Sequence, residues 1–108
     1  MVLKPTQRMK KRYILFSLKG EMSKDELSNG IYKYSLKFFG EHGLSTHIIR
    51  LIEFDEKKKE GILLVNRDAA NNLLGMLALI NEMGGKPARI LAKKTSGTIR
   101  SLKAKDRD

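Results

Sequence analysis

Two segments of the sequence, one near each end, combine basic side chains with groups that bind phosphate. The first, residues 5–13, holds four cations, and the second, residues 93–103, places small hydroxyl residues around a glycine, between lysines and arginines. Backbone N–H groups beside a glycine can approach a phosphate, while hydroxyls and cations complete the contact. The predicted contacts to a phosphate backbone are Arg8, Lys10, Lys11, Arg12, Lys93, Lys94, Ser96, Gly97, Thr98, Arg100 and Lys103.

Residues that could perform catalysis are scarce. His42 and His47 are the only histidines, and neither has an acidic or histidine neighbour at the spacing of a metal site. Ser96 and the pair at 45–46 have no companion base at a recognisable spacing, so nucleophilic catalysis is not predicted. We therefore expect no catalytic residue, metal site or cofactor in this chain.

The net charge of +10 is concentrated at the two ends of the chain. Residues 1–12 hold five basic and no acidic side chains, and residues 86–108 hold eight basic and two acidic ones. Residues 13–85 hold nine basic and ten acidic side chains, so the middle of the chain is almost neutral. This distribution is typical of a protein that binds a polyanion. The alternative is that the basic ends only increase solubility.

A length of 108 residues leaves room for one domain. We expect a basic N-terminal arm at 1–12, a single domain at 13–94 and a basic C-terminal segment at 95–108. No apolar run approaches the roughly 18 residues of a membrane span, and no signal-peptide pattern opens the chain. Together with the absence of cysteine, this predicts a cytoplasmic protein without disulfides.

The first half of the chain predicts a strand followed by a helix. Residues 13–19 alternate in the manner of a strand. Ser23 and Glu26 have the spacing of a capping box, in which each side chain accepts from the other residue's backbone N–H. The apolar stripe of the helix is Leu27, Ile31, Tyr34 and Phe38. Gly40 or Gly43 is expected to end the helix.

The second half predicts two strands, a helix and a last strand. The strands are expected at 46–54 and 62–66, and Asp68 is expected to cap the helix that follows. The apolar stripe of this helix is Leu73, Met76, Leu77, Ile80 and Met83. Gly84–Gly85 is expected to stop it, and residues 88–92 form the last strand.

This order of elements predicts an α+β fold, a ferredoxin-like or RRM-like βαββαβ sandwich with two helices on one face of an antiparallel sheet. The other face would lie uncovered, and Leu15 would point toward it if Phe16 points inward. The second strand is apolar in both registers, as strands buried on both faces are. We therefore predict that Leu15 lies at an interface with a partner protein, and that the isolated protein self-associates or is poorly soluble.

Base readout is not predicted for the sheet. Residues 61–67, the third strand, contain no aromatic side chain, so the stacking residues of an RRM are missing there. Contact with nucleic acid is predicted to run through the basic ends, to phosphates more than to bases. Within the second basic segment we expect Gly97 to have a tight backbone conformation and Arg100 to pair with a phosphate.

Several motifs resemble archaeal ribonuclease P protein component 2. The arm Pro5-Thr6-x-Arg8-x-Lys10-Lys11-Arg12-Tyr13-Ile14 and the segment Ser96-Gly97-Thr98-Ile99-Arg100 are similar to that family. So are Ser23-Lys24-Asp25-Glu26, Phe54-Asp55-Glu56 and Asn66-Arg67. The similarity covers nearly the whole chain in the same order, and the Ser-Gly-Thr-Ile segment is its most specific part.

The resemblance implies a subunit of the ribonucleoprotein that removes the 5′ leader of precursor tRNA. In that family the RNA performs metal-dependent hydrolysis, so Mg²⁺ is expected at the RNA. It also implies binding to ribonuclease P RNA and to ribonuclease P protein component 3, with precursor tRNA in the holoenzyme.

Two alternatives to this interpretation remain. The first is a ribosomal or ribosome-associated RNA-binding protein of the same fold. The second is a metabolite-sensing or acyl-phosphate-hydrolysing domain, which needs a ligand loop after the first strand. The loop there, Gly20-Glu21-Met22, is short and acidic, which argues against an acidic ligand.

Overall fold

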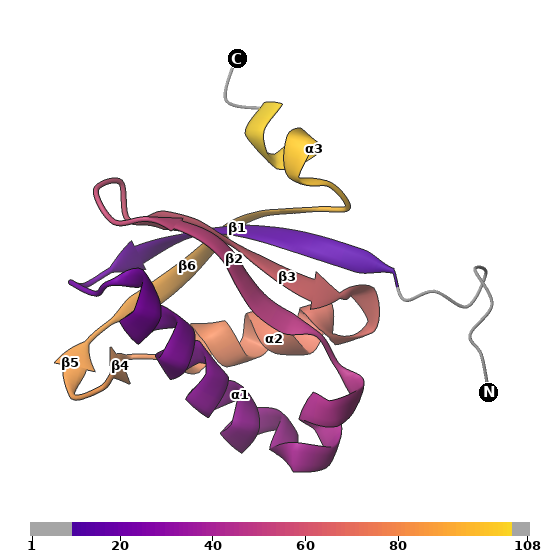
Figure 1. Ribbon diagram of the computed structural model, residues 1–108, viewed down its shortest axis with the longest axis horizontal. Coiled ribbons are helices and arrows are strands. Elements are labelled where there is room, and N and C mark those ends of the chain that lie inside the picture. Colours follow the sequence, from indigo (N-terminus) through magenta and orange to yellow (C-terminus); the bar gives the residue numbers. More distant parts are fainter. Residues whose placement is uncertain (1–9, 105–108) are drawn as a thin grey trace.

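A four-stranded antiparallel sheet is the centre of the computed structural model, which describes residues 10–104 (Figure 1). The helices and strands are β1 (Lys11–Lys19), α1 (Lys24–Thr46), β2 (Ile49–Asp55), β3 (Glu60–Asn66), α2 (Arg67–Leu79), β4 (Glu82–Met83), β5 (Lys86–Pro87), β6 (Arg89–Ser96) and α3 (Ile99–Ala104). The strand order of the sheet is β2-β3-β1-β6, which is the ferredoxin-like order and confirms the predicted fold class. No helix of the described chain is long and apolar enough to cross a membrane.

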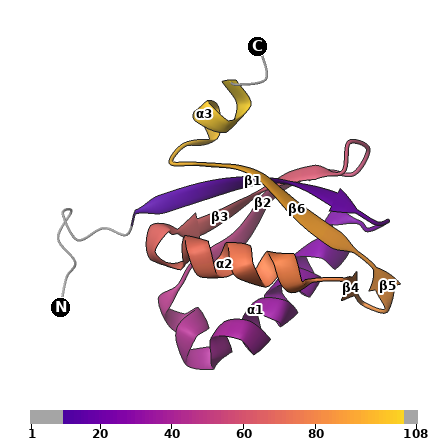
Figure 2. The ribbon, with the colours of Figure 1, turned by 180° about the vertical axis from the view of Figure 1, so that it is seen from behind.

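The main core lies between the sheet and helices α1 and α2, which cover the same face (Figures 1 and 2). The alternation predicted for β1 is present, because Ile14, Phe16 and Leu18 are buried against these helices. Leu27 and Ile31 of α1 are buried as expected, whereas Phe38 is 46% exposed. Gly40, with φ 78° and ψ 168°, interrupts α1, and helical turns then continue to Thr46. The second strand therefore begins at Ile49 and not at residue 46.

A bulge explains why the second strand is apolar in both registers. The pairing of β2 with β3 shifts between Leu51 and Glu53, so Leu51 and Phe54 both pack against the core although they are three residues apart. On β3, a Cβ at Gly61 would lie 2.7 Å from the Glu53 carbonyl oxygen and 2.7 Å from Cζ of Phe16. Only glycine fits where the Phe16 ring packs beneath the hairpin.

Two of the predictions for α2 are wrong. The helix begins at Arg67, directly after β3, so Asp68 lies in its first turn and does not cap it. At its other end the helix stops at Leu79, because Ile80 has an extended backbone. Gly84 and Gly85, both with positive φ, instead form the two-residue turn between β4 and β5, where such turns need positive φ.

The prediction of an uncovered sheet face is also wrong in part. The last strand continues to Ser96, and the chain then forms α3 on the face opposite α1 and α2 (Figures 1 and 2). Leu102 of α3 is fully buried there, and Ile62 and Leu64, which face the same side, are only 1% and 7% exposed. The chain thus covers much of this face itself. Strands also cross both predicted domain boundaries, since β1 begins at Lys11 and β6 continues to Ser96.

Candidate nucleic-acid interface

Three segments that are far apart in sequence meet at one end of the sheet. The backbone N–H of Arg67, at the start of α2, donates to the carbonyl oxygen of Lys10 at 2.7 Å. Tyr13 of β1 pairs with Ser96, the last residue of β6. Gly97 follows, and a Cβ there would lie 3.5 Å from Nη1 of Arg12. We call this region the basic end and define it by Lys10, Lys11, Arg12 and Arg67.

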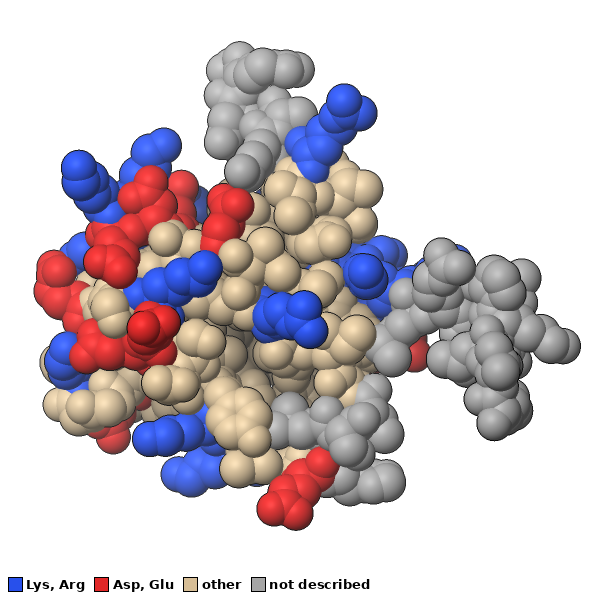
Figure 3. Space-filling model, viewed as in Figure 1, with Lys and Arg blue, Asp and Glu red and all other residues tan. Residues whose placement is uncertain are grey.

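The cations of the basic end have no acidic partners in residues 10–104, where the ion pairs are Lys59–Glu21, Lys86–Glu26 and Lys93–Glu60. Arg12 instead donates from Nη1 to the backbone carbonyl of Lys11 at 3.1 Å. Figure 3 shows most of the visible acidic side chains on the left, over the β2–β3 hairpin and the start of α1. Unpaired cations on one side make that side the surface that attracts a polyanion.

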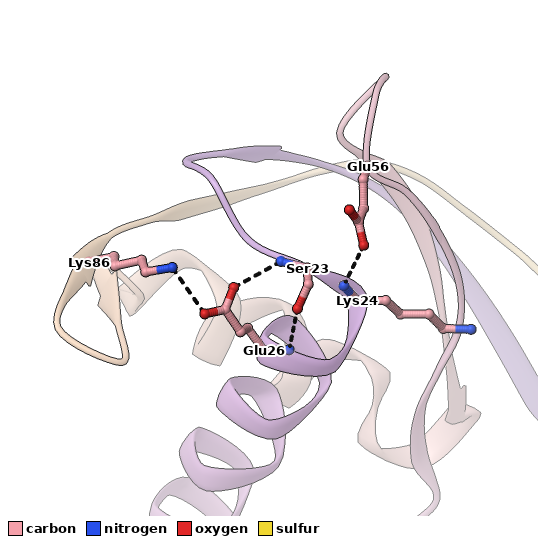
Figure 4. Close-up of polar contacts among 5 residues, drawn as sticks. All are labelled: Ser23, Lys24, Glu26, Glu56 and Lys86. Carbon is pink, nitrogen blue, oxygen red and sulfur yellow. Dashed lines mark hydrogen bonds and ion pairs between the residues drawn. The ribbon is translucent and has the colours of Figure 1, made fainter.

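The opposite end of the molecule, which we call the hairpin end, contains residues 55–60 and the start of α1. The predicted capping box is present there (Figure 4): the Ser23 N–H donates to Glu26 Oε1 at 3.0 Å, and the Glu26 N–H donates to Ser23 Oγ at 3.2 Å. Lys86 reaches Oε2 of Glu26 at 3.0 Å. The Ser23 N–H and the Lys86 ammonium together lower the pKa of Glu26.

Carboxylates hold the hairpin itself in the same way. Oδ1 of Asp55 accepts the N–H groups of Lys57 and Lys58 at 2.9 and 3.1 Å. These two bonds, that from Lys58 first, lower the pKa of Asp55. Lys59 donates to Glu21 and lowers the pKa of that carboxyl. Of the three consecutive lysines, only Lys59 has an ion pair in the described chain, but all three lie among carboxylates and so do not form a bare cationic surface. These carboxylates belong to Glu21, Asp55, Glu56 and Glu60.

The predicted contacts Lys93 and Lys94 lie away from the basic end. Lys93 is the extra residue of a bulge in the pairing of β6 with β1, and its Nζ donates to Glu60 Oε2 at 2.7 Å. Nζ of Lys94 donates to the carbonyl oxygen of Ser101 at 3.3 Å and so joins β6 to α3. Arg8 lies outside the described residues, as does the side chain of Lys103.

The hydroxyl residues around Gly97 cap α3. Oγ1 of Thr98 accepts the N–H of Ser101 at 3.1 Å, as an N-cap residue does, and Oγ of Ser96 accepts the N–H of Thr98 at 3.3 Å. The expectation of a tight backbone at Gly97 is wrong: its φ is not positive, and a Cβ there would make only an ordinary contact. The segment turns the chain onto the sheet and places Arg100 on the exposed side of α3.

Arg67 is a cation of this region that was not predicted from the sequence. Its position follows from the antiparallel pairing of β1 with β3, which puts the start of one strand beside the end of the other. The predicted interface residue Leu15 is half-buried beside Leu102, and both line a groove of about 360 Å³ on the face that carries α3. Helix α3 of the same chain thus lies next to Leu15, where a partner protein was predicted.

Comparisons with known proteins agree along nearly the whole chain. The Rpp14/Pop5 family matches residues 12–105. Ribonuclease P protein component 2 of Pyrococcus horikoshii is 40% identical over 105 residues, covering 95% of this chain and 88% of that protein. The protein of the same name from Methanocaldococcus jannaschii is 38% identical over 105 residues, covering 95% of this chain and 77% of its own.

Among solved structures, a chain of yeast ribonuclease MRP has a similar fold. It superposes with a TM-score of 0.69 over 86% of this chain and 78% of its own length. The two sequences are 11% identical, so this similarity concerns the fold alone.

Proposed function

Since the chain belongs to the Rpp14/Pop5 family, we propose that it is an RNA-binding protein subunit of ribonuclease P. The holoenzyme removes the 5′ leader of precursor tRNA by endonucleolytic cleavage. The observation that carries the proposal is the match over 95% of this chain to proteins named ribonuclease P protein component 2. The separation of the basic end from the carboxylates of the hairpin end supports RNA binding independently.

In this proposal the RNA is the catalyst and this chain supports it. Mg²⁺ acts at the RNA and is not assigned to any residue of the chain. The part played by the chain is electrostatic: Lys10, Lys11 and Arg12 enter β1 beside Arg67, so four cations gather at one end of the sheet and can neutralise neighbouring phosphates. Each phosphate that is neutralised releases counterions, which makes binding favourable and dependent on salt.

Component 3 and precursor tRNA are the other proposed partners, with the cytoplasm as the compartment. Leu15 stays the predicted contact for component 3, and the groove beside Leu102 is the surface available to it. Because Leu102 lines the same groove, Leu15→Glu would disturb α3 as well as a partner. Self-association of the isolated protein is expected to be weaker than the sequence suggested, since Leu102 of α3 already lies beside Leu15 and Ile62.

Reconstituted cleavage tests the proposal. Ribonuclease P RNA, component 3 and this chain are combined with precursor tRNA, and release of the 5′ leader is measured with and without the chain. We expect the chain to increase the cleavage rate at limiting Mg²⁺. Equal rates with and without it, for protein that is folded by circular dichroism, would contradict the function.

A further inference from the structure

The sheet face that carries α3, which we call the open face, has a different composition in each row of paired residues. The strand register places four residues directly opposite one another in the row nearest the basic end, and these are Arg50, Leu64, Tyr13 and Ser96. We call them the end row. The next row is Glu53, Ile62, Leu15 and Lys94.

Helix α3 packs over the second row, and the groove beside the helix contains several acidic side chains. Leu102 lines one groove together with Leu15 and Ile62. The same groove is lined by three carboxylates, those of Glu53, Asp55 and Glu60. Lys58 also lines the groove and Lys93 pairs with Glu60, but carboxylates outnumber cations in the lining and α3 packs beside it, so this part of the face does not suit a polyanion.

The end row has the opposite character. Arg50 is exposed, and the row contains no acidic residue. Tyr13 is half-buried. It is the one Tyr or Phe of the open face in the described chain, because Phe16 and Phe54 point to the helices and the remaining Tyr and Phe residues belong to α1. Leu64, opposite Tyr13, is 7% exposed and provides an apolar floor. An aromatic ring and a guanidinium on either side of an apolar residue are suited to a nucleobase and its phosphate.

The position of the end row connects it with the basic end. Tyr13 follows Arg12 directly in β1, and its partner Ser96 precedes Gly97, which lies beside the Arg12 guanidinium. Neighbouring strands lie about 4.8 Å apart, so Arg50 and Tyr13 are separated by about 10 Å, which one nucleotide and a long side chain can span. An RNA strand held at the basic end would reach the end row without passing the acidic groove.

We propose that the end row binds one unpaired nucleotide of single-stranded RNA, with its base stacked on Tyr13 and its phosphate paired with Arg50. The inference rests on the proposed function and adds to it the form of RNA that this surface takes. A duplex cannot use the site, because its bases are already stacked on one another.

Binding of two RNA probes to the full chain tests the site. The probes are a short single-stranded oligoadenylate and an RNA duplex of the same length. We expect Tyr13→Leu to weaken binding of the single strand about tenfold and to leave duplex binding unchanged, whereas Tyr13→Phe binds as the parent does. Tyr32→Leu is the matched control, since Tyr32 is an aromatic residue of α1 that is 60% exposed. Arg50→Gln should weaken binding severalfold, while Arg89→Gln, at the far end of the open face, should not.

Cross-linking of the unaltered protein gives a measurement that does not depend on the folding of a variant. Ultraviolet irradiation with the oligoadenylate, followed by trypsin, should modify the peptide 13–19, which trypsin releases after Arg12. Cross-links only in other peptides, with Tyr13→Leu folded and binding normally, would overturn the site.

The unpaired nucleotide can come from precursor tRNA or from ribonuclease P RNA, and an experiment with the assembled enzyme distinguishes the two. Cross-linking is repeated with the label either in the 5′ leader of precursor tRNA or in ribonuclease P RNA, and transfer of either label to peptide 13–19 supports the site. Transfer of neither would overturn it. The oligoadenylate assay needs no ribonuclease P RNA, so a chain that stacks the oligonucleotide but does not stimulate cleavage would contradict the function and not the site.

Discussion

The basic end and the hairpin end each carry a short run of cations, but the two runs have different surroundings. Lys57, Lys58 and Lys59 follow Asp55, which accepts two of their N–H groups, and Lys59 pairs with Glu21. Residues 10–12 have no carboxylate partner in the described chain. In the sequence Asp55, Glu56 and Glu60 flank the lysine run, whereas residues 1–12 contain no acidic residue. The comparison teaches that cations away from carboxylates, and not the number of lysines, indicate a surface for RNA.

Truncation of Leu102, which anchors α3 to the sheet, should have the largest effect on stability and RNA binding. Leu102 is fully buried between α3 and the sheet, so Leu102→Ala should lower the free energy of unfolding by about 2–4 kcal/mol. It should also weaken RNA binding, because Arg100, an exposed residue of α3, is then no longer held against the sheet. Denaturant unfolding and RNA titration measure the two effects. Unchanged stability would show that α3 does not pack as described.

Single cations at the two ends should differ by a smaller amount. Arg67→Gln should weaken RNA binding about fivefold, a typical effect of losing one phosphate contact, and should lower the salt dependence by about one counterion. Lys58→Gln removes the same charge at the hairpin end and should change neither quantity. Titrations at several salt concentrations measure both. Equal effects of the two variants would remove the distinction between the ends.

A change at the hairpin end should affect stability and leave RNA binding intact. Ser23→Ala removes the hydroxyl that accepts the Glu26 N–H, which should cost about 1 kcal/mol of unfolding free energy. RNA affinity should stay at the parental value, since the box lies at the opposite end from the unpaired cations. Thermal unfolding and a filter-binding assay check the two parts. A loss of affinity in the folded variant would place RNA at the hairpin end.

The smallest expected effect is on the pH dependence of stability. The pKa of Glu26 in the folded protein lies below the ordinary 4.5, so its contribution is fully present above that pH and is lost as the pH falls through the lowered value. The melting temperature of the parent should therefore decrease below about pH 4.5, and Glu26→Gln should reduce this decrease. Identical pH profiles for the two proteins would show that this carboxylate does not stabilise the fold.

Local signals in the sequence were sufficient for the strand order and for the start of α1. The capping box was recognisable because its two side chains are three residues apart and bond to each other. The end of α2 was predicted four residues too late, because Ile80 and Met83 continue the helical spacing. Met83 is in fact buried from β4, against Gly30 of α1, where a Cβ would lie 2.3 Å from its sulfur.

The candidate site could be predicted only in part. The cations of residues 10–12 and Arg100 were found from composition. Arg67 and the end row could not be predicted, because they depend on which residues become neighbours across strands. The bulge between Leu51 and Glu53 changes the alternation of side chains along β2, so the face on which Arg50 lies does not follow from the residues after the bulge. Helix α3 was missed because it has six residues and a single fully buried apolar anchor, too few for a periodic pattern.

The salt dependence of RNA binding tests the central claim most directly, because it counts the phosphates that the protein neutralises. Two triple variants are compared with the parent: Lys10, Lys11 and Arg12 changed to Gln, and Lys57, Lys58 and Lys59 changed to Gln. Both remove three positive charges. The account predicts that the first variant lowers the slope of log affinity against log salt by about two to three, and that the second leaves it at the parental value. Equal decreases for the two variants, or a decrease only for the second, would contradict it.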